Sequence, residues 1–231
     1  GAVRIGISLD SLDSKKHNTL RKYENAFEEA VRGMDICNKV GLEFQIHTTV
    51  MKWNLPEMEN LTDFAVAKGA KAHHLFFLIP TGRGLNIESD MLTEIEYEEV
   101  LNKVLEKQKE VDIEIKPTCA PQFMRIAKEK EMNMRFSKGC IAGISYCIIS
   151  PKGDVQPCAY FDLRVGNVKE EAFDKIWKES PVFKEMRTEE YSGGCGECGY
   201  KYICGGCRAR AYYNYDGDYM AEDSWCILNK A

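Results

Sequence analysis

The segment CGECGYKYICGGC, residues 195–207, places four cysteines in thirteen positions with the spacing C-x2-C-x5-C-x2-C. Four more cysteines flank it at positions 140, 147, 158 and 226, while only Cys37 and Cys119 precede residue 140. Disulfides would explain such a cluster in a small secreted domain, but the chain has 231 residues and shows no secretory leader. We therefore interpret the eight clustered thiols as metal ligands.

The spacing also bears on which metal is bound. Zinc-binding patterns commonly leave about 12 to 20 residues between two C-x2-C pairs, so that the chain can return to one ion. Here five residues intervene. A loop that short spreads its thiolates more easily over a cuboidal iron–sulfur cluster or over two separate centres. Iron–sulfur is the favoured interpretation, zinc and structural thiols are the alternatives, and eight ligands suffice for two tetrathiolate sites.

The residues around the cluster predict short elements. CIISPKGDVQPC, residues 147–158, predicts a β-hairpin that turns at residues 151–154 and brings Cys147 and Cys158 to its open end. Residues 167–180 predict a connecting helix whose Phe173, Ile176 and Trp177 face inward.

The first part of the chain alternates two kinds of pattern. Apolar runs predict buried strands, and apolar residues at helical spacing predict helices between them, with Cys37 in the core. The predicted strands are 3–9, 42–50, 72–80 and 113–119, and the predicted helices are 23–40, 56–68, 93–110 and 121–132. Such βα units indicate a parallel sheet, and four of them form either a small open sheet or part of a larger barrel. A change of composition near residue 137 predicts a domain boundary there.

Charge and hydropathy exclude some classes of partner. The formal net charge is −5 and the pI is about 5.6, which gives no electrostatic support for binding nucleic acid or anionic lipid. No run of about 18 apolar residues predicts a membrane span. We expect a cytoplasmic protein whose partners are small molecules or other proteins.

The arrangement resembles the radical S-adenosylmethionine (SAM) enzymes that carry a SPASM domain. GDVQPC at 153–158, the 195–207 segment and the late Cys226 are similar to the family's seven-cysteine signature, although the last pair is spaced x2 where many members have x3. The resemblance implies two auxiliary [4Fe-4S] clusters with interleaved ligands. The implied ligands are Cys140, Cys147, Cys158 and Cys207 for the first, and Cys195, Cys198, Cys204 and Cys226 for the second.

The resemblance also implies the fold. It is α/β, with residues 1–136 as the later part of a partial (βα)6 barrel and residues 137–231 as the SPASM domain. The C-x3-C-x2-C loop with which the family binds a third [4Fe-4S] cluster and SAM does not occur in this sequence. Since the chain begins Gly1-Ala2, we expect it to start inside a longer parent that binds both, and to be unable to cleave SAM alone.

Four residues are implied as SAM contacts. GISLDS at 6–11 resembles the family's fourth strand, which points to Ser8 and Asp10, with a helix cap as the alternative for them. Asn54 either serves the same cofactor or caps a helix. Arg83 follows a strand end, where a guanidinium suits the methionine carboxylate, and a solvated loop arginine is the alternative.

The histidines have weaker signals. His47, His73 and His74 fall on predicted strands and are expected to be structural rather than ligands or proton donors. His17, in the polar stretch DSKKHN, is expected at the mouth of the active site.

Within the family, three segments are most similar to the subgroup that acts on tetrapyrroles in haem and haem d1 synthesis. They are FFLIPTGRG (76–84), CGGCRARAYY (204–213) and GDYMAEDSWC (217–226). The implied chemistry is radical removal or oxidative decarboxylation of propionate side chains, with an electron donor protein as partner. Arg208 and Arg210 would pair with substrate carboxylates or form a solvated helix face. The alternatives are a peptide- or protein-modifying maturase, a non-catalytic electron carrier and a zinc-stabilised binding module.

Overall fold

The computed structural model describes residues 1–79 and 81–230, with the side chains of residues 83, 85 and 230 outside the description. Two compact units divide after Cys119, one of residues 1–119 and one of residues 120–231. The division falls before the predicted boundary at 137, because the helix that follows Pro121 belongs to the second unit.

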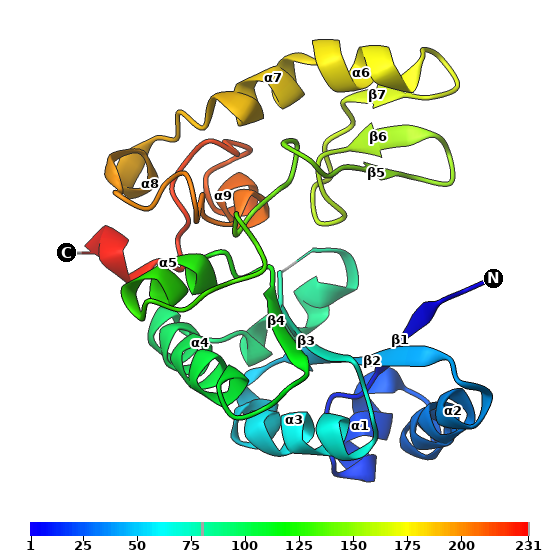
Figure 1. The fold of residues 1–231 in the computed structure, drawn as a ribbon. Coiled ribbons are helices and arrows are strands. Elements are labelled where there is room, and N and C mark those ends of the chain that lie inside the picture. Colours follow the sequence, from blue (N-terminus) through cyan, green and yellow to red (C-terminus); the bar gives the residue numbers. More distant parts are fainter. Residues whose placement is uncertain (80, 231) are drawn as a thin grey trace. The chain divides into compact units, whose positions relative to one another are not determined.

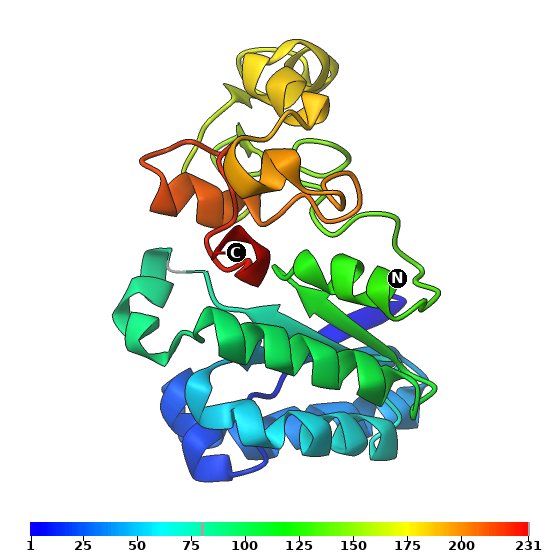
Figure 2. The ribbon, with the colours of Figure 1, turned by 90° about the vertical axis from the view of Figure 1, so that its left-hand side faces the viewer.

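The first unit is an α/β layer with a parallel sheet, as predicted. The strands stand in the order β1-β2-β3-β4, each parallel to its neighbour, and helices α2, α3 and α4 pack against one face of the sheet (Figure 1). Figure 2 shows α3 and α4 side by side on that face. The elements are β1 Arg4–Ser8, α1 Ser14–Arg21, α2 Ala26–Val40, β2 Glu43–Val50, η1 Lys52–Glu57, α3 Met58–Ala67, β3 Ala72–Phe77, η2 Gly82–Asp90, α4 Glu94–Gln108 and β4 Glu114–Thr118.

Buried and more exposed residues alternate along β2, so the strand presents one buried and one partly exposed face. Phe44, Ile46, Thr48 and Val50 are buried on the face that the helices cover, whereas Gln45, His47 and Thr49 are only partly buried. Helix α2 ends at Gly41, whose φ of 71° favours glycine, and Cys37 is buried on α2, as predicted.

The sequence prediction missed α1 and placed the start of α2 too early. Helix α1 is polar, with His17 as its buried residue, so it lacks the apolar periodicity that identifies a helix. Its start is instead capped by Asp13, whose side chain accepts hydrogen bonds from the backbone N–H groups of Lys15 and Lys16. Tyr23, predicted on the buried stripe of α2, precedes the helix and is 51% exposed.

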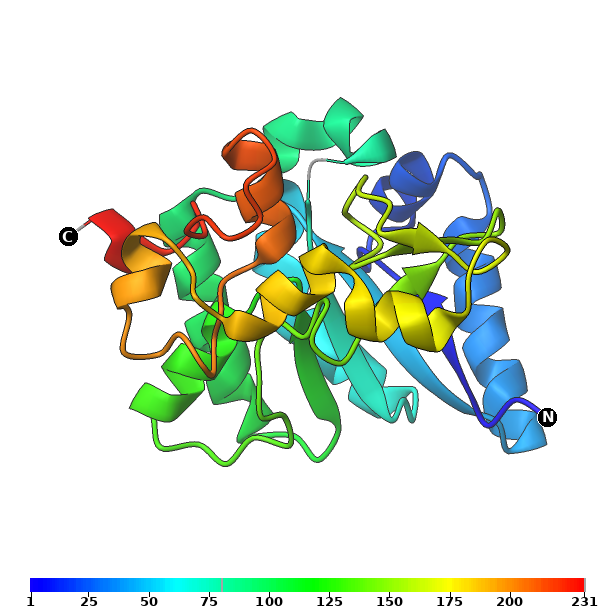
Figure 3. The same ribbon diagram turned by 90° about the horizontal axis from the view of Figure 1, so that it is seen from above.

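The second unit has short elements around a small antiparallel sheet, β5-β6-β7. The predicted hairpin is confirmed, since Ile148 pairs with Gln156 and Ile149 with Val155. Figure 3 shows α6 beside this sheet, against which it packs. The elements are α5 Gln122–Glu129, β5 Ile148–Ile149, β6 Asp154–Gln156, β7 Gly166–Asn167, α6 Phe173–Glu179, α7 Pro181–Thr188, α8 Gly193–Glu197, α9 Arg208–Asn214 and η3 Ile227–Lys230.

The predicted connecting helix is shorter than expected. Its first residue, Asn167, belongs to β7 and donates a hydrogen bond to the carboxylate of Asp154. Ile176 is buried with Val155 and Phe183, whereas Phe173, predicted to face inward, is 41% exposed. Within the described residues, no helix is long and apolar enough to cross a bilayer.

Candidate functional site

Four thiols of the second unit line one small cavity. They are Cys195, Cys198, Cys204 and Cys226, called here the second quartet, and Gln122, Arg125 and Asn229 share the cavity wall. Helix α8 carries Cys195, and Cys198 is the C-cap residue of that helix. None of the ten cysteines forms a disulfide. The structure therefore brings together the four residues that the resemblance implies as one ligand set.

Hydrogen bonds fix the sulfurs of this quartet. The backbone N–H of Tyr200 donates to Cys198 Sγ over 3.4 Å, and the backbone N–H of Asp223 donates to Cys195 Sγ, also over 3.4 Å. Backbone hydrogen bonds from Gly206 and Leu228 reach the other two sulfurs. Each of the four thiols thus has a backbone donor, and such donors stabilise the thiolate form.

The other four thiols, those of Cys140, Cys147, Cys158 and Cys207, are called here the first set, and they are less closely grouped than the second quartet. Burial raises the pKa values of Cys158 and Cys207; nearby thiolate charge adds to this, from Cys207 and Cys140 at Cys158 and from Cys140 at Cys207, so the three thiols lie close together. Cys147 instead packs against the cluster of Val155, Ile176 and Phe183. The three thiols and the second quartet are adjacent, because the backbone N–H of Cys140 donates to the carbonyl of Cys204 over 3.3 Å.

Burial sets the chemistry of both groups. It raises the pKa of Cys226 to about 11 and the pKa of Cys158 to about 12, and it also raises the pKa values of Cys195, Cys204 and Cys207. Thiolates form in such places only beside a compensating cation, which a bound metal supplies.

The arrangement fits a cluster better than a single ion. Among the described residues, no three His, Cys, Asp or Glu side chains are placed to hold one metal ion, whose ligands must lie about 2.0 to 2.3 Å from a single point. Two buried guanidinium nitrogens, Nε of Arg208 and Nη2 of Arg187, have no hydrogen-bond partner in the part of the chain that the structure describes. Arg208 reaches Cys195, and the charge of Arg187 acts on Cys147. An anionic iron–sulfur cluster would offer acceptors at both places.

Arg208 and Arg210 are not the solvated helix face that the sequence allowed. They are 2% and 1% exposed, and their partners lie inside the protein. Nη1 of Arg208 donates to the carbonyls of Tyr219 and Ala221. Arg210 forms an ion pair with Asp223. The start of α9 is buried on all sides, so neither guanidinium lies at a surface where a substrate carboxylate would meet it.

Sequence reasoning missed Asp223. This fully buried carboxylate accepts hydrogen bonds from Gln122 Nε2 over 2.7 Å and from the backbone N–H of Cys207 over 2.6 Å. Burial opposes its ionisation, but the charge and hydrogen bonds of Arg210 lower its pKa to about 2. The signal in the sequence was two arginines within three residues after Cys207 and one aspartate three residues before Cys226.

In the first unit, Asp10 follows β1 and is fully buried. Its carboxylate accepts the backbone N–H of Thr49 over 2.9 Å and pairs with Arg21 at 2.6 Å. Burial raises its pKa, but the contact with the His17 side chain and the charge of Arg21 bring the pKa below the usual value. His17 is buried under this loop, where Nδ1 accepts the Asp10 N–H; its place at the active-site mouth stays a prediction.

Asn54 holds the same loop to the end of β2. Its Nδ2 donates to the carbonyls of Asp10 and Thr49, each over 2.9 Å, and its Oδ1 accepts the backbone N–H of Met51. Asn54 is the third residue of η1, and its hydrogen bond to the N-cap residue Met51 makes it part of a capping box at the start of that helix. The Arg83 side chain lies outside the described residues. Contacts of Ser8, Asp10, Asn54 and Arg83 with SAM stay a prediction.

A polar row crosses the sheet face that the helices leave open. In register, Ser8 pairs with His47, His47 with His74, and His74 with Lys116. The two imidazole rings stack, with centroids 5.3 Å apart and planes 7° from parallel. Burial lowers the pKa of His47, and it lowers the pKa of His74 to about 4. Both rings are therefore neutral at neutral pH.

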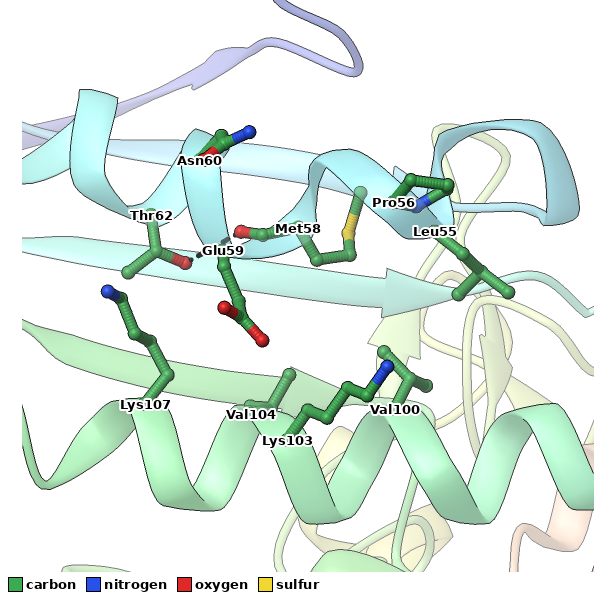
Figure 4. Close-up of a pocket in the computed structure, with 10 residues that line it drawn as sticks. All are labelled: Leu55, Pro56, Met58, Glu59, Asn60, Thr62, Val100, Lys103, Val104 and Lys107. Carbon is green, nitrogen blue, oxygen red and sulfur yellow. Dashed lines mark hydrogen bonds between the residues drawn. The ribbon is translucent and has the colours of Figure 1, made fainter.

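The expected structural role is confirmed for His73. This residue lies on the helix-covered face, fully buried between the hydroxyls of Thr48 and Thr62. A separate groove of about 320 Å³ lies between α3 and α4, with Met58, Val100 and Lys103 among its walls (Figure 4). It contains none of the predicted site residues.

Comparison with known proteins places the chain in a family. The SPASM iron-sulfur cluster-binding domain family matches residues 140–199. Two AdoMet-dependent heme synthases are similar over 98% of this chain, that of Nitratidesulfovibrio vulgaris with 41% identity and that of Methanosarcina barkeri with 40%. The chain spans 65% of the first relative's length and 68% of the second's.

Solved structures show the same fold. Streptococcus suis SuiB bound to its precursor peptide SuiA superposes with a TM-score of 0.72 and 19% identity, over 97% of this chain and 53% of SuiB. Because the Methanosarcina barkeri relative is 40% identical and this chain covers more than two thirds of its length, the chain belongs to the radical S-adenosylmethionine enzymes that carry a SPASM domain.

Proposed function

We propose that this chain is the later part of a radical SAM/SPASM oxidoreductase that modifies propionate side chains of a tetrapyrrole in haem or haem d1 biosynthesis. The observation that carries the proposal is the 41% identity to an AdoMet-dependent heme synthase across nearly the whole chain. The C-x3-C-x2-C loop is absent from these 231 residues. The proposal therefore assigns SAM cleavage, and the third [4Fe-4S] cluster, to the longer protein.

The thiols of the second unit support two auxiliary [4Fe-4S] clusters. Cys195, Cys198, Cys204 and Cys226 share a cavity, and three of the four residues proposed for the other cluster interact through their charges. We assign Cys147 as the fourth ligand of that cluster. In this proposal, residues 1–136 are barrel and residues 137–231 are the SPASM domain.

In this proposal Ser8, Asp10, Asn54 and Arg83 would hold SAM in the longer protein, and SAM would supply the 5′-deoxyadenosyl radical that takes a hydrogen atom from a propionate side chain. Loss of the carboxylate as CO2 then leaves a vinyl group and one electron, which an auxiliary cluster can accept. The chain's own residues position the substrate. The open sheet face offers the Ser8 hydroxyl, the imidazoles of His47 and His74 and the Lys116 ammonium in one row, and these groups suit carboxylates.

The test uses the natural full-length protein, reconstituted anaerobically with iron and sulfide. We expect SAM cleavage under a strong reductant to require an iron-porphyrin carboxylate, with loss of CO2 from that substrate. The auxiliary sites should add about eight iron and eight sulfide per chain to those of the SAM-binding cluster. Two zinc ions in place of that iron, or turnover confined to a peptide, would refute the proposal.

The second candidate function is modification of a ribosomally made peptide. It is favoured by the fold that this chain shares with SuiB, a protein solved with its precursor peptide. That likeness is at 19% identity and concerns the fold, whereas the heme synthases are similar at twice that identity. A competition assay that offers the porphyrin and a candidate peptide together separates the two functions by which substrate is consumed.

A further inference from the structure

Arg208 is a buried cation in contact with a sulfur of the second quartet. Its Nη2 lies 3.8 Å from Cys195 Sγ, and Arg208 is 2% exposed. We propose that Arg208 sets the reduction potential of the cluster bound by Cys195, Cys198, Cys204 and Cys226, through a charged hydrogen bond to Cys195. This inference rests on the proposed function, because it requires a cluster at these thiols.

The guanidinium is held in place from three sides. Nη1 donates to the Ala221 carbonyl over 2.6 Å and to the Tyr219 carbonyl over 2.9 Å. The ring of Tyr191 lies beneath the guanidinium carbon at 4.4 Å. The Arg208 guanidinium is planar, and it is held at Nη1 by two carbonyls and on one face by the Tyr191 ring. It therefore cannot rotate away from Cys195, so its contact with the sulfur is a permanent feature of the fold.

The charge of Arg208 is not cancelled locally. Its hydrogen-bond acceptors in the described part of the chain are two carbonyls and a sulfur, with no carboxylate among them. Arg210 makes the contrast, because Asp223 neutralises it through two contacts of 2.8 Å. Of these two neighbouring arginines, Arg208 is therefore the one that contributes net positive charge beside the quartet.

The positive charge of Arg208 would shift the equilibrium between the oxidised and reduced forms of the cluster. A cluster gains a negative charge on reduction, and a fixed cation at low dielectric stabilises the reduced form more than the oxidised form. The same sulfur also accepts the backbone N–H of Asp223, so two donors converge on Cys195. Hydrogen bonds to ligand sulfurs act in the same direction, which is toward a higher potential.

The experiment compares variants of the full-length natural protein by potentiometric titration followed by EPR. We expect Arg208→Gln to shift the potential of one auxiliary cluster to a more negative value and to leave the other unchanged. Arg208→Lys keeps the charge and should keep the potential close to that of the wild type. The matched control is Arg187→Gln, because Arg187 is a half-buried arginine with a buried Nη2 near Cys147 of the other set, and its loss should leave the potential of this cluster unchanged.

If Arg208→Gln assembles both clusters and neither potential moves, the inference is wrong. If that variant does not assemble its clusters, wild-type protein labelled with ¹⁵N-arginine decides the question. Pulsed EPR of the reduced cluster should then detect a guanidinium ¹⁵N coupling that disappears in Arg208→Lys, and an unchanged or undetectable coupling overturns the inference. A wild-type protein that binds no auxiliary iron would instead refute the proposed function itself.

Discussion

Arg210 and Asp223 form a two-contact ion pair in which neither side chain is exposed to solvent. Nε of Arg210 donates to Oδ1 of Asp223 and Nη2 of Arg210 donates to Oδ2 of Asp223, each over 2.8 Å. Asp223 also accepts from Gln122 and from the backbone of Cys207. One carboxylate therefore joins α5, the start of α9 and the segment that leads to Cys226, and the cysteines of both sets depend on where these segments lie.

Asp223→Asn should destabilise the second unit strongly. Removing one partner of a buried pair leaves an uncompensated charge on Arg210, which typically costs about 3–5 kcal/mol. The free energy of unfolding is measured by denaturant titration of the cluster-loaded protein. Asp216→Asn is the control, since Asp216 is exposed at φ 49°, a conformation that asparagine tolerates. Equal stability of the two variants would show that the pair does not hold these segments together.

Cysteine substitutions should separate the two clusters. Cys195→Ser removes a ligand of the second quartet and Cys158→Ser removes a ligand of the other set, so each should lower iron and sulfide by about four per chain relative to the wild type. Cys37→Ala is the control, because Cys37 is buried on α2 in the first unit. Loss of all auxiliary iron from either single variant would contradict two independent ligand sets.

Gly6 is required by the His47 ring. A Cβ at position 6 would lie 2.5 Å from His47 Cε1, so Gly6→Ala must displace the ring and disturb its stacking on His74. We expect a loss of about 1–3 kcal/mol, as for other overpacked sites. In a His47→Ala background the same substitution should cost little. The difference between the two costs, obtained from a double-mutant cycle of unfolding free energies, measures the contact; equal costs in both backgrounds would contradict it.

Local patterns predicted the elements that depend on local contacts. The alternation on β2 and the turn at residues 151–154 identify a strand and a hairpin without any tertiary information. Helix α1 was missed because its cap, rather than an apolar stripe, stabilises its start. The burial of Arg208 and Arg210 could not be predicted, because it depends on partners 11 to 88 residues away, such as the Tyr219 carbonyl and Gln122.

For the cysteine ligands too, local sequence predicted one part of the site and distant contacts determine the rest. Spacing alone predicted metal binding, but the assignment of cysteines to two sets came from the family resemblance. The structure places the four cysteines of the second quartet on one cavity, which five intervening residues in the 195–207 segment cannot indicate by themselves. Hydrogen bonds to the sulfurs depend on backbone N–H groups such as that of Asp223, which no side-chain pattern reports.

His73 should make the stability of the first unit depend on pH. Thr48 donates its hydroxyl proton to the Leu9 carbonyl over 2.6 Å, so its oxygen is placed to accept from His73 Nε2 at 2.8 Å. Thr62 lies 2.9 Å from Nδ1 and 3.0 Å from the Met58 carbonyl. The neutral ring, protonated at Nε2, is satisfied if Thr62 turns its proton from that carbonyl to Nδ1.

Burial lowers the pKa of His73 from 6.5 to about 3. Below pH 6.5 the unfolded chain therefore binds a proton that the folded chain does not, and stability falls as the pH falls from 6.5 toward 3. The slope from this residue is at most about 1.4 kcal/mol per pH unit.

His73→Gln should lower stability at pH 7.5 by about 1–3 kcal/mol, through loss of buried hydrogen bonds. It should also flatten the pH dependence, measured as unfolding free energy at pH 7.5, 6 and 5. His74 and the carboxylates contribute equally to both proteins and cancel in the comparison, so parallel curves would show that His73 is protonated in the folded state or does not titrate in this range.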